Sequence, residues 1–170
     1  MALVLAGATL DLHLCLIRRA EHDLDRWSGH MALPGGRVDA GDPSARAAAI
    51  RETREEVGLQ LDCAPYLGSL DGVPVSAAGK PTGIELSSFV FHLGDSLAQL
   101  TYSDEVAEAF WVPLRHLLDP RNASRKATVR DGRTVSHPAI LYQGHHIWGL
   151  THRLLAAFFA HMHLRIALPD

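Results

Sequence analysis

The sequence predicts a protein that mixes helices and strands, of the α/β or α+β class, and two observations lead to that prediction. Short apolar runs bounded by turn-forming residues recur along the chain, and such runs are typical of strands. Two longer stretches, residues 43–57 and 148–164, have the composition or the spacing of helices. Short strands combined with two main helices favour a sandwich in which helices pack on a sheet.

Length and composition are those of one ordinary globular domain, which we expect to span residues 1–170. A chain of 170 residues is long enough to bury a sizeable core and too short to expect two domains. The formal net charge of −3 gives no general attraction for polymeric nucleic acid or for an anionic membrane. Cys15 and Cys63 lie far apart in apolar runs, so we expect reduced core cysteines and no disulfide framework.

The N-terminal residues favour two strands over a secretion signal. Apolar residues 2–6 and 12–17 predict strands joined by a turn near residues 9–11. No basic segment precedes the apolar start, and the nearest charges, Arg18 and Arg19, follow it, which argues against a signal peptide. Because no stretch reaches transmembrane length, we expect a cytoplasmic protein without a membrane partner.

Residues 18–30 are polar, charged and rich in turn formers, and they lead into a Gly-Gly loop. We therefore expect them at the rim of whatever site that loop forms. Arg18, Arg19 and Arg26 are candidates for phosphate contacts, because a guanidinium fork matches phosphate oxygens. Ion pairs with acidic residues of the same segment are the alternative for each arginine. Trp27 either stacks on a base or covers the core, and we favour the core.

The first predicted helix has recognisable boundaries. Asp42 is a plausible N-cap residue with Pro43 at the first helical position, so the helix is expected to begin there. Helix-forming residues fill the middle of the stretch, and Gly58 is a C-terminal stop.

After this helix, residues 66–70 and 83–93 predict two strands, and the sequence SAAGKPTG between them predicts a loop. In the second strand, alternation places Phe89 and Phe91 on one face and Val90 on the other.

The next elements are shorter. Residues 106–112 predict a strand that ends at a proline, and residues 114–118 predict a short helix. The stretch NASRKATVRDGRT suggests a mobile segment with a hairpin turn at its Asp-Gly pair, residues 131–132. Residues 134–142 predict a strand, and Pro138 within it indicates an edge position.

Residues 148–164 predict an amphipathic to largely apolar helix. Leu150, Leu154, Phe158 and Met162 recur at helical spacing beside further apolar residues. A helix with so much apolar surface is either buried or packed on a partner, and a homodimer is one such partner arrangement.

Three glutamates at the end of the first helix are the strongest chemical signal. Glu52, Glu55 and Glu56 share an arc of roughly 100° on a helix of 3.6 residues per turn. Like charges this close repel each other unless a cation neutralises them, and carboxylate oxygens suit Mg²⁺ or Mn²⁺. The alternative is a solvated acidic helix end, but acidic residues there also face the unfavourable end of the helix dipole. A local rule broken in this way is typical of functional sites.

The stretch from residue 33 to residue 59, LPGGRVDAGDPSARAAAIRETREEVGL, resembles the Nudix box, G-x5-E-x7-R-E-U-x-E-E-x-G-U with U an aliphatic residue. The matching residues are Gly36, Arg51, Glu52, Glu55, Glu56, Gly58 and Leu59. Three departures occur. The segment between Asp42 and Arg51 is one residue longer, Asp42 stands in place of the first Glu, and Thr53 occupies the first aliphatic position.

The resemblance implies a Nudix-type α/β/α sandwich, with a mixed sheet between helices and the box helix lining a cleft. It also implies a Mg²⁺ or Mn²⁺ site formed by Glu52, Glu55 and Glu56 with the backbone carbonyl of Gly35. The implied reaction is hydrolysis of a pyrophosphate bond, in which divalent ions neutralise phosphate oxygens and lower the pKa of the attacking water. Gly36 lets the backbone approach the substrate closely.

Two further roles follow from the resemblance. Arg51 lies next to Glu52 and four residues before Glu55, and is expected to hold a carboxylate in place. A plain surface ion pair is the alternative for Arg51. Family members take the catalytic base from the box or from a distant loop. Glu55 is the box candidate and Glu105 or Asp104 the loop candidate, with an ordinary surface charge as the alternative.

A second resemblance concerns the coenzyme A branch of the Nudix family, in which L-L-T-x-R-S/A precedes R-x3-G-x3-F-P-G-G. The matching residues are Leu16, Arg19, Ala20, Arg26, Gly29 and residues 33–36. Arg26 is one residue too close to Gly29, Leu33 replaces the Phe, and the segment carries an extra residue. Near the C-terminus, GHHIWGLTHRLL resembles the I-W-G-x-T segment of the same branch.

These resemblances imply a hydrolase whose leading substrate is coenzyme A or an acyl derivative, with Arg19, Arg26 and Gly36 as substrate-binding residues. ADP-ribose, a dinucleotide or an oxidised nucleoside triphosphate are alternatives within the same chemistry. A Nudix-fold module that senses a nucleotide without hydrolysing it is the alternative of another class.

Overall fold

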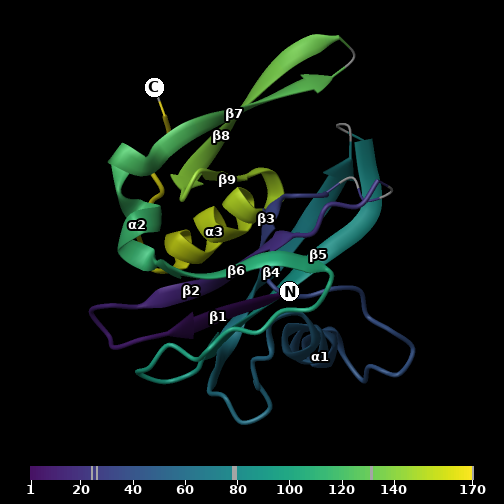
Figure 1. The fold of residues 1–170 in the computed structure, drawn as a ribbon, viewed down its shortest axis with the longest axis vertical. Coiled ribbons are helices and arrows are strands. Elements are labelled where there is room, and N and C mark those ends of the chain that lie inside the picture. The colour runs from purple at the N-terminus through teal and green to yellow at the C-terminus, as the bar shows by residue number, and fades with distance from the viewer. Residues whose placement is uncertain (24, 26, 78–79, 131, 170) are drawn as a thin grey trace.

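The computed structural model describes residues 1–23, 25, 27–77, 80–130 and 132–169. A mixed six-stranded sheet lies between helix α1 (Ala45–Val57) on one face and helix α3 (Gly149–His161) with the short α2 (Leu114–Leu118) on the other (Figure 1). This arrangement confirms the predicted α/β/α sandwich.

Strand β2 (His13–Arg19) organises the sheet. It pairs antiparallel with β1 (Ala2–Ala6), with the two-residue β3 (Met31–Ala32) and, along its other edge, with β6 (Val106–Pro113). On its other edge, β1 pairs with β5 (Lys80–His92), and these two strands are parallel. Strand β4 (Tyr66–Ala77) pairs antiparallel with β5 and completes the sheet.

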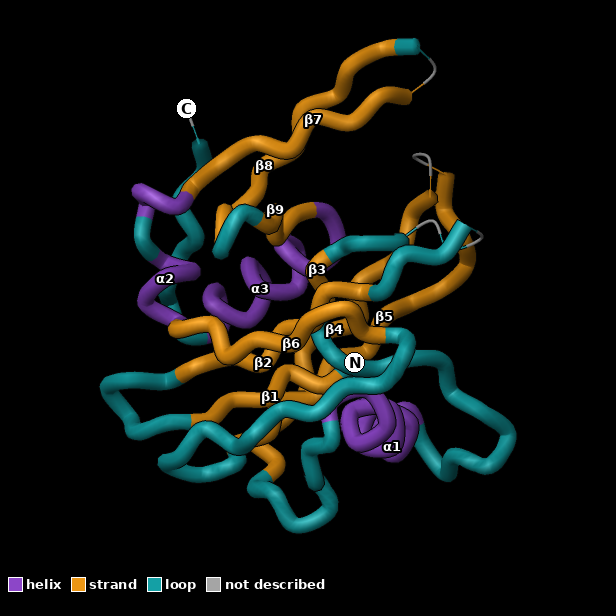
Figure 2. Tube along the Cα trace, viewed as in Figure 1, coloured by secondary structure: helices purple, strands orange, loops and turns teal. Residues whose placement is uncertain are grey.

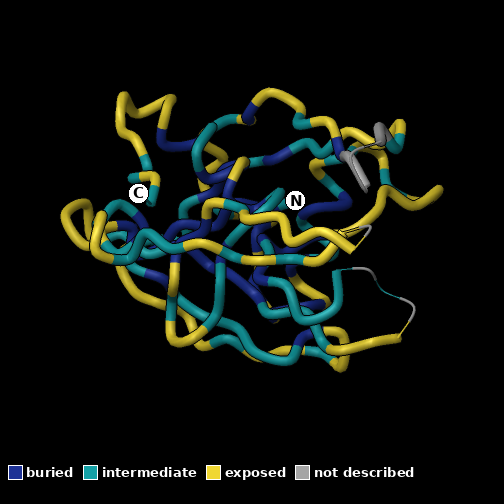
Figure 3. Tube along the Cα trace, turned by 90° about the horizontal axis from the view of Figure 1, so that it is seen from above, coloured by how far each residue is buried: buried dark blue, intermediate teal, exposed yellow. Residues whose placement is uncertain are grey.

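The alternation of side chains along the strands builds two apolar cores. In β1, Leu3 and Leu5 pack in the cluster that contains the apolar face of α3, whereas Ala2 and Val4 pack in the cluster that contains Val57 of α1. Buried segments accordingly gather in the middle of the molecule while the connecting loops lie outside (Figure 3). The sheet therefore needs a helix on each face.

A second, three-stranded antiparallel sheet stands beside α3. Its strands are β7 (Ala123–Arg130), β8 (Arg133–Tyr142) and β9 (His145–Trp148), preceded by a 3-10 turn at Pro120–Asn122. The β7–β8 hairpin projects away from the body of the molecule (Figure 2). Of residues 122–134, expected to be mobile, residues 123–130 form β7 and residues 133–134 begin β8, because the two strands pair with each other. Of the expected hairpin turn, Asp131 lies outside the described residues.

Pro138 predicted that its strand lies at the edge of a sheet. This is wrong for the strand as a whole, but Pro138 itself is paired on one side only. Strand β8 is the middle strand of its sheet, but β9 pairs with it only from Ala139 onward. Pro138 therefore has a partner, Arg125, on one side only, and its missing N–H leaves no gap in the β8–β9 ladder.

Helix α1 begins later than expected. Ser44, not Asp42, is the N-cap, and its hydroxyl accepts a hydrogen bond from the Ala47 N–H at 3.1 Å. The Asp42 carboxylate instead accepts two hydrogen bonds from Arg51, a residue in the middle of α1. The C-terminal prediction is confirmed, since Gly58 has φ +73° and its N–H reaches the Arg54 carbonyl.

Other boundaries moved in the same way. Strands β4 and β5 extend into the expected loop, to Ala77 and from Lys80, with register shifts that absorb the irregular residues.

Cys63 is exposed, contrary to expectation, whereas Cys15 is buried and both are free. Helix α3 is buried against the first core cluster, so its apolar surface is largely satisfied within the chain. Among the described residues, no helix is long and apolar enough to span a membrane.

Candidate active site

The glycine loop and the end of α1 meet at Glu56. The Gly35 N–H donates a 2.7 Å hydrogen bond to Glu56 Oε2, and this glutamate is only 3% exposed. The loop is fixed to β1 because the Ala2 N–H donates to the Pro34 carbonyl at 2.8 Å. Gly35 has φ +133°, and a Cβ there would stand 2.7 Å from Met1 Cα. Only glycine fits this backbone and this space.

Gly36 lies directly against Glu52. A Cβ on Gly36 would overlap the Glu52 carboxylate, so the absence of a side chain is what allows the two to meet. The Glu52 side chain is 18% exposed, which leaves its carboxylate partly accessible at the mouth of the loop. Both glycines of the pair therefore contact a carboxylate of the cluster, Gly35 that of Glu56 and Gly36 that of Glu52.

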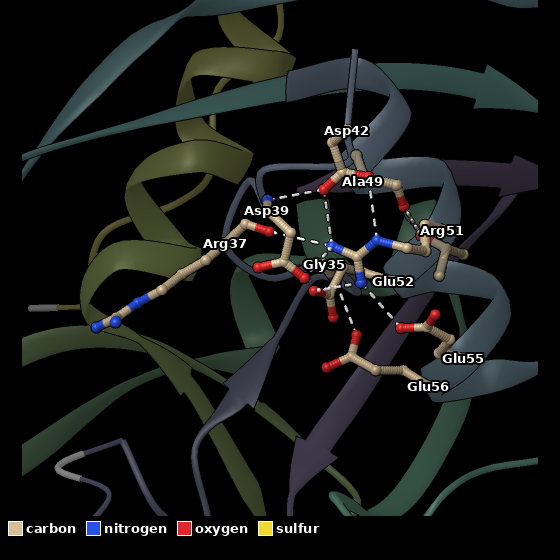
Figure 4. Close-up of polar contacts among 10 residues, drawn as sticks. Gly35, Arg37, Asp39, Asp42, Ala49, Arg51, Glu52, Glu55 and Glu56 are labelled. Atoms are coloured by element: carbon tan, nitrogen blue, oxygen red, sulfur yellow. Dashed lines mark hydrogen bonds and ion pairs between the residues drawn. The ribbon is translucent and has the colours of Figure 1, made fainter. Parts of the chain in front are cut away.

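Arg51 lies at the centre of the polar network (Figure 4). Its guanidinium donates to Asp42 at 2.9 and 3.1 Å, to Glu52 Oε1 at 3.0 Å and to Glu55 Oε2 at 2.9 Å. It also reaches the Arg37 carbonyl at 3.2 Å. The expected contacts of Arg51 with Glu52 and Glu55 are therefore present. Asp42, whose side chain is 7% exposed, is a partner that the helix-capping prediction missed.

This network has a clear electrostatic sign. The Arg51 hydrogen bonds, with a backbone hydrogen bond from Asp39, hold the pKa of Asp42 below its usual range. The surrounding carboxylates raise the pKa of Arg51 above its usual value, with Asp42 as the largest cause. Both shifts favour the charged forms, the carboxylate of Asp42 and the guanidinium of Arg51.

Glu56 lies in the opposite electrostatic environment. Burial, and to a smaller extent the charges of Glu52 and Glu105, raise its pKa to about 7. The hydrogen bond from Gly35 and the charge of Arg19 oppose this shift without cancelling it. A buried carboxylate whose charge the protein compensates only in part is a place where a cation would be stabilised.

The loop that carries the second acidic candidates is tied to the end of the box helix. The Thr101 and Ser103 N–H groups donate to the carbonyls of Val57 and Glu56, each at 3.2 Å. Glu105 accepts a 2.8 Å backbone hydrogen bond from Ala20. These contacts bring the loop to the carboxylate cluster, and the charge of Glu105 acts on Glu56. Asp104 and Glu105 are both exposed.

The arginines of residues 18–30 have different surroundings. Arg19 binds Asp25 Oδ2 at 2.9 Å, which is the ion-pair alternative within the segment, and its charge also acts on Glu56. Arg18 forms an ion pair at 2.8 Å with Glu108 of β6, a residue outside its own segment. Arg26 lies outside the described residues. Trp27 is half-buried.

The departure at Thr53 has a local explanation. Thr53 is fully buried on α1, and its hydroxyl donates to the Ala49 carbonyl at 2.6 Å. With the hydroxyl bonded inside the helix, the Thr methyl faces the core as an aliphatic side chain would.

The donors present suit a hard divalent cation, since they are carboxylate oxygens around the buried Glu56, whose charge is compensated only in part. In the part of the chain that the structure describes, no three acidic, His or Cys side chains are grouped closely enough to hold one ion. Arg51 binds one oxygen each of Glu52 and Glu55, and the second oxygen of each carboxylate makes no hydrogen bond to Arg51. These second oxygens are the ones that could join Glu56 in a ligand set.

Comparisons with known proteins agree with this geometry. The model of the NUDIX domain matches residues 2–131. The chain is 33% identical over 156 residues to mitochondrial coenzyme A diphosphatase NUDT8 of Homo sapiens, across 86% of this chain and 65% of that protein. It is 44% identical over 116 residues to an uncharacterized protein of Schizosaccharomyces pombe, across 66% of this chain and 35% of that protein. The chain thus spans less than two thirds of the length of either relative.

The fold has solved counterparts. A MutT/nudix family protein from Enterococcus faecalis superposes with a TM-score of 0.55 at 18% identity, covering 95% of this chain and 60% of that one. At that identity the likeness concerns the fold alone. The sandwich, the glycine loop beside the box glutamates and the match over residues 2–131 lead to one conclusion: the chain belongs to the Nudix family.

Proposed function

We propose that this domain hydrolyses a pyrophosphate bond in a small nucleotide-linked metabolite, with Mg²⁺ or Mn²⁺ as cofactor. The observation that carries the proposal is the buried Glu56, whose carboxylate lies against the Gly35 N–H with the charges of Glu52 and Glu105 acting on it. A cluster that raises the pKa of its own central carboxylate destabilises the metal-free protein. It makes chemical sense if a cation is bound there during function.

In this proposal, Glu52, Glu55 and Glu56 hold the ion together with the Gly35 carbonyl. The bound ion would neutralise phosphate oxygens and lower the pKa of the attacking water. The rest of the chemistry falls to residues of the chain. Arg51 positions Glu52 and Glu55 through its hydrogen bonds.

The remaining roles concern the substrate and the proton. Gly36 leaves the loop backbone open to the substrate, and Arg19 and Arg26 contact its phosphates. Glu55, which is half-exposed, is the box candidate for the base that takes the proton of the water. Glu105, or its neighbour Asp104, is the loop candidate.

Coenzyme A or an acyl derivative is the leading substrate. Support comes from the human relative, which is named a coenzyme A diphosphatase, and from the partial match of residues 16–36 to the pattern of that branch. ADP-ribose, a dinucleotide and an oxidised nucleoside triphosphate are the alternatives. We further propose that residues 1–170 act as one domain, because Ile140, Ile147 and α3 share a core cluster with strands β1 and β2.

The test is a panel of coenzyme A, ADP-ribose, NADH and 8-oxo-dGTP incubated with the protein and Mg²⁺. The proposal expects turnover of coenzyme A to adenosine 3′,5′-bisphosphate and a phosphopantetheine product, and loss of turnover with a chelator. Turnover of only another compound of the panel would show that coenzyme A is not the substrate, while the proposed pyrophosphate hydrolysis would stand. Nucleotide binding without turnover of any compound would replace the enzyme by a sensing module.

A further inference from the structure

The small sheet carries a group of aromatic and basic side chains on one face. Lys126 of β7 lies opposite His137 of β8, and Trp148 of β9 lies opposite Ala139, two residues further along β8. Cross-strand partners and alternate residues share a face, so Lys126, His137 and Trp148 lie on the same face. The other face carries Ile140, which is buried in the core.

The rings of this face are in contact. The Trp148 ring centroid is 4.8 Å from that of His30 and 5.2 Å from that of His137. His137 is held in turn by a 3.0 Å hydrogen bond between Nε2 and the Thr128 hydroxyl. His30, His137 and Trp148 are only half-buried. The face therefore presents a fixed aromatic surface that the core does not use.

The charge state of this face favours an aromatic, anionic ligand. Burial, and then the charge of Lys126, lower the pKa of His30. The same two causes lower the pKa of His146 on β9. His30 is therefore neutral at neutral pH, and the Lys126 ammonium is near enough to act on both imidazoles. A neutral imidazole and an indole ring with the Lys126 ammonium nearby suit a nucleobase that carries a phosphate.

The aromatic surface is fixed at a short distance from the box. The Thr151 hydroxyl at the start of α3 donates to the Met31 carbonyl at 2.8 Å, which attaches this end of the small sheet to β3. His30 and Gly35 are five residues apart, so at most about 17 Å separates their backbones. Arg19 lies near both places, because its charge acts on Glu56 and on His30.

We propose that the face formed by His30, His137 and Trp148 stacks on the adenine ring of the substrate, with Lys126 binding the phosphate on its ribose. The pyrophosphate then lies at Arg19 and the box glutamates. This inference rests on the proposed function for the direction of the substrate. The ligand class is a nucleoside diphosphate that carries one additional phosphate.

The first test substitutes Trp148 and measures binding of the two halves of coenzyme A separately. Trp148→Leu should weaken binding of adenosine 3′,5′-bisphosphate by roughly tenfold or more, the usual scale for one base stacked on one ring. Binding of 4′-phosphopantetheine, which has no base, should stay within about twofold. Trp148→Phe keeps a ring and should restore most of the affinity. Equal losses for both ligands, or no loss for either, would overturn the inference.

The second test removes one positive charge from either face of β7. Lys126→Gln should weaken binding of adenosine 3′,5′-bisphosphate by roughly tenfold and leave binding of adenosine 5′-monophosphate nearly unchanged. Arg125→Gln is the matched control, because Arg125 lies on the opposite face and donates to the Ser136 hydroxyl at 2.8 Å. Equal effects of the two substitutions would contradict the role of Lys126. Should Trp148→Leu not fold, this comparison and Trp148→Phe decide.

These binding measurements need no turnover, so the two proposals fail separately. Ring-dependent binding of adenosine 3′,5′-bisphosphate without hydrolysis of any pyrophosphate would sink the proposed enzyme and keep the ligand site. Hydrolysis of coenzyme A with no response to Trp148→Leu would do the reverse.

Discussion

Replacing Glu56 by Gln should stabilise the metal-free protein while it removes metal binding. The pKa of Glu56 is raised from 4.5 to about 7, chiefly by burial, so the folded state binds this proton more tightly than the unfolded state. Stability from this group is full below the unfolded value and is lost as the pH rises through the folded value. A shift of this size corresponds to about 3 kcal/mol, which is an upper bound because neighbouring side chains relax. Gln carries no charge, and its amide oxygen can still accept the Gly35 hydrogen bond.

The assay is urea unfolding of both proteins with a chelator present. At about pH 8, Glu56→Gln should raise the free energy of unfolding by up to about 3 kcal/mol, and near pH 5 by less than about 1 kcal/mol. Glu55→Gln is the control, since that carboxylate is half-exposed and should change stability by no more than about 0.5 kcal/mol. A variant that is less stable than wild type at pH 8, or a gain that does not depend on pH, would refute the reasoning about Glu56.

Four further outcomes are expected. Mg²⁺ binding near pH 7 should release a proton from Glu56, seen by calorimetry in buffers of different ionisation enthalpy, and buffer-independent heats would argue against it. Arg51→Lys should lower kcat by about 10- to 100-fold, whereas Arg54→Lys on the exposed side of α1 should not, so equal effects would count against a positioning role. Gly36→Ala should abolish hydrolysis because its Cβ overlaps a box carboxylate, and retained turnover would contradict that geometry. Thr53→Val should keep activity and change the unfolding free energy by less than about 1 kcal/mol, because only a hydroxyl bonded within its own helix is lost.

The sequence predicts the parts of the site that depend on local spacing. Glu52, Glu55 and Glu56 share one side of α1 because they lie within little more than one helical turn, and Gly58 ends the helix because its φ is positive. The contacts of Arg51 with its neighbours on the helix follow from the same spacing. These features need no knowledge of the rest of the chain.

The features that were missed depend on contacts between distant residues. Asp42 before a proline satisfies every local rule for an N-cap, yet it binds Arg51, and Ser44 caps the helix instead. The residue count from the box motif contained a usable signal, because Asp42 stands in place of its first Glu. Likewise, Trp148 meets His30 only through the pairing of β9 with β8 and the attachment of α3 to β3, which no local pattern encodes.

The most direct test of the central claim is a titration of Mn²⁺ by electron paramagnetic resonance, comparing wild type with Glu56→Gln. The claim is that the buried carboxylate at the Gly35 N–H is the centre of a divalent metal site. It predicts that wild type binds Mn²⁺, more tightly above pH 7 than below it, and that the folded Gln variant binds at least about tenfold more weakly. Equal Mn²⁺ binding by the two proteins would contradict it.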